Sequence, residues 1–290
     1  MWFLLSIVSA LFSSATSLLE KKVLLKEHAL AFSSTLAFWV FLLNIPLFII
    51  FNHAGIPPLL PLGIIAITAI LGGTAFLFIT ESVIHMEVSE ISPLIAIGPA
   101  ITALFGFAFL GEILTLPQIA GIIIIMFGIY ILELKDRSHL LAPFKALVKG
   151  RYVHFVFVAL LLCACTDVLG KIVLSKYGFL PGTYLFYYQM FTAMFFLIIV
   201  IFKRKHMNVE LPKTRMDIWL IILIAILTIT YRFTHLSAMK LAPIGIAIAV
   251  FRSSTVITTI LGGRIYKEKD IARKLLAALI VIGGVILIAM

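Results

Sequence analysis

The stretch LLEKKVLLK, residues 18–26, has a counterpart 150 residues later in VLGKIVLSK, residues 168–176. Each stretch closes a long apolar run and carries two or three lysines. A glutamate followed by a glycine also recurs, at a shift of 156, in Glu112 and Gly128 and again in Glu268 and Gly284. The chain is therefore predicted to be a tandem repeat with a unit of about 150 residues.

The apolar runs around these stretches are too extensive for a soluble domain. Of the 290 residues, 62% are hydrophobic and 12% are charged, and the mean hydropathy is +1.18. Average soluble domains contain about 45–50% apolar and about 25% charged residues. The net charge of +10 does not indicate a nucleic-acid binder, because the basic residues lie between apolar runs and not over one solvated face. The composition predicts an integral membrane protein without a nucleic-acid partner.

Ten apolar segments approach the ~20 residues that a helix needs to cross a bilayer core. They cover approximately residues 2–19, 30–51, 59–84, 89–110, 115–134, 152–175, 181–202, 217–239, 243–263 and 272–290. We therefore expect an all-α integral membrane protein of ten transmembrane helices, with a first five-helix repeat (1–134), a basic connecting loop (135–151) and a second five-helix repeat (152–290). Since five is odd, the second repeat enters the membrane from the opposite side, which predicts inverted repeats with a solute site between them.

The first apolar run, from Trp2 to Leu19, has no basic region before it and no cleavage pattern after it, so we expect a retained helix and not a signal peptide. Cys163 and Cys165 lie two residues apart in an apolar run and would point to different sides of a helix, so no disulfide or metal site is predicted. No cofactor is predicted either. The sequence lacks a Walker-type glycine-rich loop, which argues against an ATP-driven pump.

Basic residues are distributed unequally between the two expected sides of the membrane. Of the 23 Lys and Arg, 18 follow the first, fifth, seventh and ninth segments, which all end on the same side. Lys171, Lys176 and Lys240 lie towards the opposite side, and Arg232 and Arg252 lie within segments. The positive-inside rule makes the basic side cytoplasmic, which places both termini outside the cell membrane.

The stretch FLGEILT, residues 109–115, with Gln118, Gly121 and Gly128, resembles the motif that closes each half of the EamA family in the drug/metabolite transporter superfamily. The segment before it, from Ser92 to Pro99, is similar to the preceding family helix. The resemblance implies a ten-helix secondary transporter for metabolites, often amino acids, with a central cavity. It also implies cytoplasmic termini, which is the opposite of the orientation that the basic residues predict.

Three charged residues lie within about one turn of the expected helix centres: Asp167, Arg232 and Arg252. A charge at this depth costs ~2.5–3.5 kcal/mol on insertion scales, so it usually faces a cavity or a partner. Together the three leave one positive charge uncompensated, which a carboxylate or phosphate of a solute would satisfy. Alternatively, Asp167 pairs with one arginine, or with Lys171 one turn further on, and the charges have structural roles.

Uncharged polar residues within the segments are further candidates for solute contact: Gln189, Tyr231, Asn44 and Ser17. Each can equally make an interhelical hydrogen bond, typically worth under about 2 kcal/mol. Glu81, His85 and His235 are candidates for coupling transport to protons. For Glu81 and His85, which lie near the end of a segment, the alternative is a solvated position at the membrane interface.

These observations favour a secondary transporter in the cell membrane that exports or exchanges an amino acid or another small carboxylate-bearing solute. Transport of phosphorylated metabolites is the alternative within this class, because two arginines suit a phosphate as well. An intramembrane enzyme is a different class, and the sequence has no HExxH pair, no Gly-x-Ser-x-Gly elbow and no pair of deep aspartates. The expected partners are a small solute and the lipid bilayer, and the sequence does not determine an oligomeric state.

Overall fold

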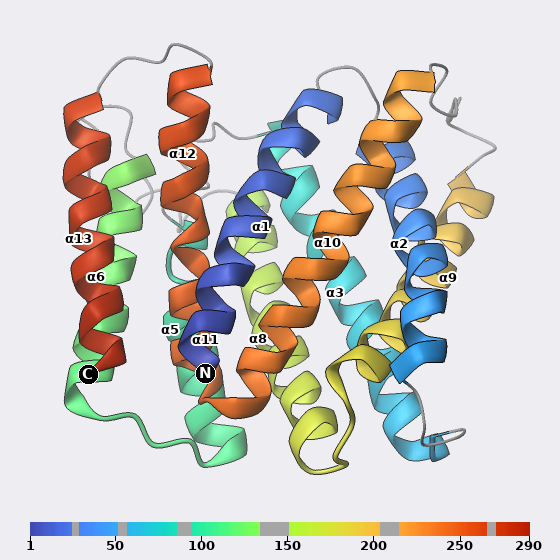
Figure 1. The fold of residues 1–290 in the computed structure, drawn as a ribbon, viewed down its shortest axis with the longest axis horizontal. Coiled ribbons are helices and arrows are strands. Elements are labelled where there is room, and N and C mark those ends of the chain that lie inside the picture. Colours follow the sequence, from blue (N-terminus) through green and yellow to red (C-terminus); the bar gives the residue numbers. More distant parts are fainter. Residues whose placement is uncertain (25–28, 52–56, 86–93, 134–150, 204–214, 266–270) are drawn as a thin grey trace.

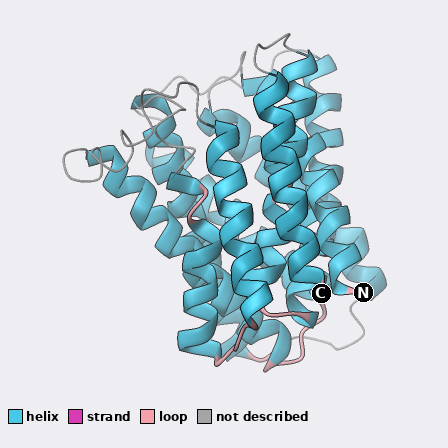
Figure 2. Cartoon of the chain, turned by 90° about the vertical axis from the view of Figure 1, so that its left-hand side faces the viewer, coloured by secondary structure: helices cyan, strands magenta, loops and turns pink. Residues whose placement is uncertain are grey.

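The computed structural model describes residues 1–24, 29–51, 57–85, 94–133, 151–203, 215–265 and 271–290. Within these residues every regular element is a helix (Figures 1 and 2). The elements are α1 (Trp2–Leu24), α2 (Ala29–Phe51), α3 (Leu59–His85), α5 (Gly98–Phe105), the π-helix η1 (Gly106–Leu110), α6 (Leu116–Glu133), α8 (Arg151–Ser175), α9 (Pro181–Lys203), α10 (Arg215–Leu241), α11 (Ile244–Arg252), α12 (Ser254–Ile265) and α13 (Ile271–Ala289).

Six of these helices are long and apolar enough to cross a membrane: α1, α2, α3, α8, α9 and α10. Shorter apolar helical stretches cover Gly98–Leu110, Leu116–Leu132, Ile244–Thr258 and Leu276–Ala289. Large apolar side chains are exposed on the outside, among them Leu59 at 86% and Trp219 at 69%. Because an apolar exterior of this extent suits lipid and not water, the helices have the lengths and the surface of a membrane protein. The all-helical prediction is confirmed for the described residues.

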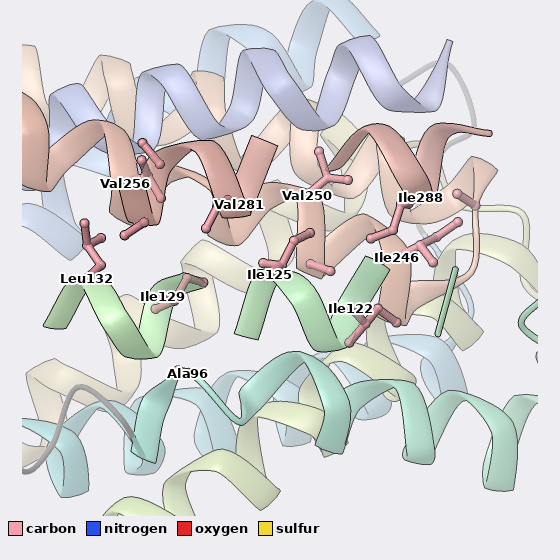
Figure 3. Close-up of a cluster of buried hydrophobic side chains, with 14 residues drawn as sticks. Ala96, Ile122, Ile125, Ile129, Leu132, Ile246, Val250, Val256, Val281 and Ile288 are labelled. Atoms are coloured by element: carbon pink, nitrogen blue, oxygen red, sulfur yellow. The ribbon is translucent and has the colours of Figure 1, made fainter. Parts of the chain in front are cut away.

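Helices from the first part of the chain pack against helices from the second part. α1 lies against α10, and α3 lies against α8. α2 packs on α9, α5 on α11, and α6 on α13, and the last pair forms one side of the molecule (Figure 1). One buried apolar cluster joins Ile125 of α6 to Val250 of α11 and Val281 of α13 (Figure 3). Both parts of the chain therefore contribute to a common core.

Glycines allow α6 and α13 to approach each other closely. A Cβ atom at Gly121 would lie 2.8 Å from the carbonyl oxygen of Gly284, and a Cβ atom at Gly284 would lie 2.8 Å from that of Gly121. A Cβ atom at Gly128 would lie 2.6 Å from Cγ2 of Val281. Small residues at helix interfaces are typical of membrane proteins, where packing and not the hydrophobic effect joins the helices. Helix packing thus explains why the family motif has glycines at positions 121 and 128.

Two helices are interrupted where the sequence predicts continuous segments. α11 ends at Arg252 and α12 begins at Ser254, and the Ser253 amide donates to the Val250 carbonyl at 3.1 Å in a tight turn. α5 begins at Gly98 after a turn at residues 96–97, and Pro99 occupies its first turn. The expected continuous helix over 243–263 is therefore corrected to two shorter helices.

The first helix is longer than predicted, because α1 continues to Leu24 and not only to residue 19. Glu20 consequently lies within the helix and is half-buried. Both chain termini lie at one end of the molecule, where α10 turns into α11 and where η1 connects to α6 (Figures 1 and 2). We call the end that carries Met1, Met290 and this turn the terminal end.

Candidate functional site

A cavity of about 310 Å³ lies among α3, α8, α9, α10 and α11. Thr68 of α3 is its lining residue from the first part of the chain. The remaining lining residues are Cys163, Thr166, Asp167 and Gly170 of α8, Tyr184, Leu185 and Tyr188 of α9, Tyr231, Arg232, His235, Leu236 and Met239 of α10, and Phe251 of α11. The volume is at the lower end of the range for small-molecule sites, which suits a small metabolite.

Aromatic side chains hold Arg232 at the cavity. Its Nε donates a hydrogen bond to the Tyr231 hydroxyl oxygen at 3.3 Å. Its guanidinium carbon lies 5.7 Å from the ring centre of Tyr188 and 5.9 Å from that of Tyr231, within range for cation–π attraction. Among the described residues, Arg232 makes no further hydrogen bond, so its two Nη groups can donate to a carboxylate.

Asp167 lines the same cavity from α8. Thr102 Oγ1 donates a hydrogen bond to Asp167 Oδ2 at 3.3 Å, and the Arg252 guanidinium interacts with the carboxylate electrostatically. Within the described ranges, the direct ion pairs are Glu81 with His85 and Glu112 with Lys171, and neither of them includes Asp167. The Asp167 carboxylate can therefore accept hydrogen bonds from a cationic group of a solute.

Arg252 lies beside the cavity and is not part of its lining. It is the last residue of α11, immediately before the turn at Ser253. A Cβ atom at Gly98, the first residue of α5, would lie 4.0 Å from Arg252 Nη2. The Nε atom is buried and has no hydrogen-bond partner in the described part of the chain. The second predicted arginine thus lies between the two interrupted helices.

His235 lies one turn from Arg232 on α10 and lines the cavity. Its ring is tilted against that of Phe251, with 4.6 Å between the centroids. Its Nδ1 atom is buried without a hydrogen-bond partner among the described residues, and both Arg232 and Arg252 interact with it electrostatically. Of the three candidate coupling residues, His235 is the one that a bound solute can reach.

Glu81 and His85 lie near the end of α3 and do not line the cavity. Their side chains are 51% and 39% exposed, with 3.7 Å between the carboxylate and the imidazole Nδ1. The His85 ring stacks on Tyr152 with 4.3 Å between the centroids. This geometry fits a position at the membrane interface, the alternative that the sequence left open.

The uncharged candidates, apart from Tyr231, also lie away from the cavity. Asn44 of α2 is 1% exposed and Gln189 of α9 is 2% exposed, and their amide nitrogens have no partner among the described residues. Ser17 is exposed on α1. Gln189 directly follows Tyr188, and the structure turns the tyrosine and not the amide towards the cavity.

Several functional candidates escaped the sequence analysis. Tyr184 and Tyr188 stack on each other with 6.0 Å between the centroids, and both line the cavity. Their spacing of four residues on one helix face was the available signal, but it is shared by many packing residues. Glu20 of α1 interacts electrostatically with Arg232, so the first part of the chain also supplies a charge. Glu20 was not a candidate in the sequence analysis, because it directly precedes Lys21 and Lys22 and resembles a loop residue.

The lining of the cavity offers groups that can bind a small solute. The lining offers a guanidinium, a carboxylate, three tyrosines and a phenylalanine within one small cavity. No cluster of three or more His, Cys, Asp or Glu that could hold a metal occurs among the described residues. A solute with a carboxylate, a cationic group and an apolar part would find a complementary group for each.

Comparisons with known proteins show the family and the fold of the chain. The family model of the EamA-like transporter family matches residues 1–134 and 150–290. The uncharacterized protein MJ1333.1 of Methanocaldococcus jannaschii is 39% identical over 70 residues, which are 24% of this chain and 51% of that protein, so the chain spans about half the length of this curated relative. A solved structure named "Crystal structure of protein" is 14% identical in sequence, and the match covers 100% of this chain and 98% of that chain with a TM-score of 0.74. This likeness concerns the fold alone. Since the family match covers both parts of the chain, the protein belongs to the EamA-like transporter family and is a multi-pass membrane protein.

Proposed function

We propose that the protein is a secondary transporter that exports or exchanges an amino acid, or a similar zwitterionic solute, across the cell membrane. One observation carries the proposal: Arg232 and Asp167 line the same cavity, and no direct ion pair joins them within the described residues. Family membership supports the transport of a small solute. Arg232 and Asp167, neither of which is in a direct ion pair among the described residues, support the chemical class of that solute.

Each end of a zwitterion has a partner in the cavity. A guanidinium presents a planar fork of N–H groups that fits a carboxylate, and the ring contacts with Tyr188 and Tyr231 orient that of Arg232. The Asp167 carboxylate suits an ammonium group, since a buried charge is stable only with a partner. Tyr184 and Phe251 provide apolar surface for a side chain. Discrimination among amino acids therefore depends on the aromatic part of the lining.

The proposal includes ten membrane-spanning segments arranged as two inverted repeats. The helix contacts support it, because exchanging the two repeats turns the contact of α1 with α10 into that of α8 with α3. The same exchange turns the contact of α5 with α8 into that of α11 with α1. The turns at Ile97 and Ser253 differ by 156 residues, the shift that also relates Glu112 to Glu268. Interrupted helices of this kind accompany solute sites in inverted-repeat transporters.

The competing solute class is phosphorylated metabolites. Arg252 favours it, because a second guanidinium lies close to the cavity and interacts electrostatically with Asp167 and His235. Asp167 opposes it, because its carboxylate repels a phosphate at short range in a low-dielectric site. The two classes therefore differ in how they respond to removal of the Asp167 charge.

A thermal-shift screen on the purified protein tests the proposal. The ligands are amino acids, the corresponding deaminated acids and sugar phosphates. We expect Arg232→Gln to weaken binding of amino acids and deaminated acids by about 10- to 100-fold, because charge-assisted hydrogen bonds are worth about 1.5–3 kcal/mol. We expect Asp167→Asn to weaken binding of amino acids but not of deaminated acids.

Glu81→Gln is the matched control, because it removes a carboxylate from a membrane helix outside the cavity. It should leave every ligand response unchanged. Amino-acid responses that survive both Arg232→Gln and Asp167→Asn would refute the assignment of the two groups. Stronger responses to sugar phosphates than to amino acids, enhanced further by Asp167→Asn, would establish the competing class.

A further inference from the structure

The turn between α10 and α11 is bound by a partly buried lysine. Lys171 of α8 directs its Nζ to the carbonyl oxygens of Met239 and Ala242, the latter at 2.6 Å. These carbonyls belong to the end of α10 and the residue after it, where backbone acceptors lack helical partners. A cation at a helix C-terminus is also favoured by the helix dipole. Lys171 therefore stabilises the end of α10.

Glu112 binds the other side of the same turn. Its Oε2 accepts a hydrogen bond from the amide of Ile244, the first residue of α11, at 2.7 Å. Its Oε1 lies 3.6 Å from Lys171 Nζ, and both side chains are 14% exposed. A carboxylate at a helix N-terminus is favoured by the helix dipole in the same way. We call Glu112, Lys171 and the backbone groups that they bind the polar latch.

The polar latch joins the two parts of the chain. Glu112 follows η1 of the first part, whereas Lys171 and Ile244 belong to the second part. The carboxylate passes directly over Gly106, where a Cβ atom would lie 2.8 Å from Oε2 and 2.9 Å from Cγ1 of Ile244. Gly111 has a φ of +67°, which turns the chain after η1 and favours glycine. Glycines at both positions therefore allow Glu112 to reach α11.

The polar latch lies beside the cavity at the terminal end. Gly170, which precedes Lys171 in the chain, lines the cavity. Met239, whose carbonyl oxygen accepts a hydrogen bond from Lys171, also lines it. An apolar cluster of Val168, Ile244 and Ala247 packs there with Phe105 and Leu110 of the first part. In Figure 1 the turn from α10 to α11 and the segment after η1 lie together at this end. The latch and its apolar cluster thus lie between the lining residues Gly170 and Met239 and the segment that follows η1.

We infer that the polar latch is the gate of the cavity at the terminal end, and that it opens once in each transport cycle. The inference rests on the transporter function but not on the identity of the solute. A transporter must expose its site alternately to the two sides, which requires contacts between the repeats to separate on one side at a time. At the turn between α10 and α11, Glu112 of the first part contacts Ile244 and Lys171 of the second part, so loss of these contacts frees α11 and the end of α10 to move away from η1.

The native Cys163 provides a direct test, because its thiol lines the cavity. In a Cys165→Ser background, the anionic, membrane-impermeant reagent MTSES is applied to either side of sealed vesicles without any solute. A tag after Met290 identifies the side of the terminal end. We expect slow labelling of Cys163 from that side in the background protein. Glu112→Ala and Lys171→Met should each accelerate it about tenfold, since each removes at least one charge-assisted hydrogen bond.

Two further variants distinguish a polar latch that opens from one that closes the cavity permanently. Lys240→Met removes another lysine that donates to a carbonyl, that of Phe179 at 2.9 Å, but this bond stays within the second part of the chain. It should not change labelling. Glu112→Gln keeps an oxygen for the Ile244 amide and loses the charge that attracts Lys171, so it should accelerate labelling without unfolding the protein.

Unchanged labelling of Cys163 from the terminal end in Glu112→Ala, Glu112→Gln and Lys171→Met would overturn the inference, provided that their melting temperatures in detergent match that of the background protein. The cluster would then be a permanent cap. Since the labelling is performed without solute, a failure of the amino-acid assignment leaves this result unaffected.

Discussion

At the scale of single residues, Cys163 reports on the cavity that Arg232 and Asp167 share. A solute bound between the two charges would cover its thiol, whereas Cys165, two residues further along α8, is not part of the lining. We expect a transported amino acid to slow labelling of Cys163 saturably and to leave labelling of Cys165 unchanged. Rates measured separately in Cys163→Ser and Cys165→Ser proteins check this. Equal protection of both thiols would indicate a global conformational change in place of direct cover.

Tyr188 tests whether the aromatic surroundings of Arg232 matter for binding. Its ring lies 5.7 Å from the guanidinium carbon, and cation–π attraction is worth about 0.5–2 kcal/mol. We expect Tyr188→Leu to weaken binding of the amino acid with the largest thermal shift by about 2- to 30-fold. Tyr188→Phe retains the ring and serves as the control, with little loss expected. Comparable losses in both variants would assign the role to the hydroxyl group.

Sequence reasoning named the charged lining residues and Tyr231, and it missed Tyr184 and Tyr188 for a physical reason. Asp167, Arg232 and His235 stand out because polar groups are rare and costly within membrane segments. Tyr184 and Tyr188 do not stand out in a chain with 24 Phe and 8 Tyr, where most aromatic rings serve packing or face lipid. Which face of a helix points inward depends on its neighbours. That information belongs to the tertiary structure.

At the scale of helices, the contact between α6 and α13 depends on glycines that permit backbone approach. A Cβ atom at Gly284 would lie 2.7 Å from Cγ1 of Ile125 and 2.8 Å from the Gly121 carbonyl oxygen, whereas one at Gly283 would meet nothing within 4 Å. We expect Gly284→Ala to destabilise the protein by about 1–3 kcal/mol through overpacking. Gly283→Ala should be neutral or slightly stabilising, because alanine favours helix. Melting temperatures in detergent distinguish the two, and equal values would contradict this packing.

The extent of most helices was predictable, since long apolar runs bounded by charged segments leave little freedom in a bilayer. The turn at Ser253 was not, because no proline or glycine marks it and Arg252 was interpreted only as a charge. At the other interruption, Pro99 was present but was read as part of a motif. An interruption without a helix-breaking residue is maintained by tertiary contacts, and local sequence does not encode it.

At the scale of the whole molecule, the charge distribution predicts an orientation that determines which side the polar latch faces. The lysines and arginines that follow the first, fifth, seventh and ninth predicted segments account for 18 of 23, which favours a cytoplasmic location for that side and places the terminal end outside. In a protein lacking Cys163 and Cys165, we expect Asn52→Cys to react with an impermeant maleimide in intact cells and Lys145→Cys to react only after permeabilisation.

The opposite labelling pattern would give the cytoplasmic termini that the family resemblance implies, and would place the gate at Glu112 on the inside. The two orientations also differ in the side from which Cys163 can be labelled once the polar latch is opened. With the terminal end outside, loss of the Glu112 charge admits external MTSES to Cys163 in intact cells. With the terminal end inside, the same variant reacts only in inverted vesicles. Labelling of Asn52→Cys therefore determines the orientation of the molecule. Labelling of Cys163 in the Glu112→Gln protein independently determines on which side of the membrane the gate lies.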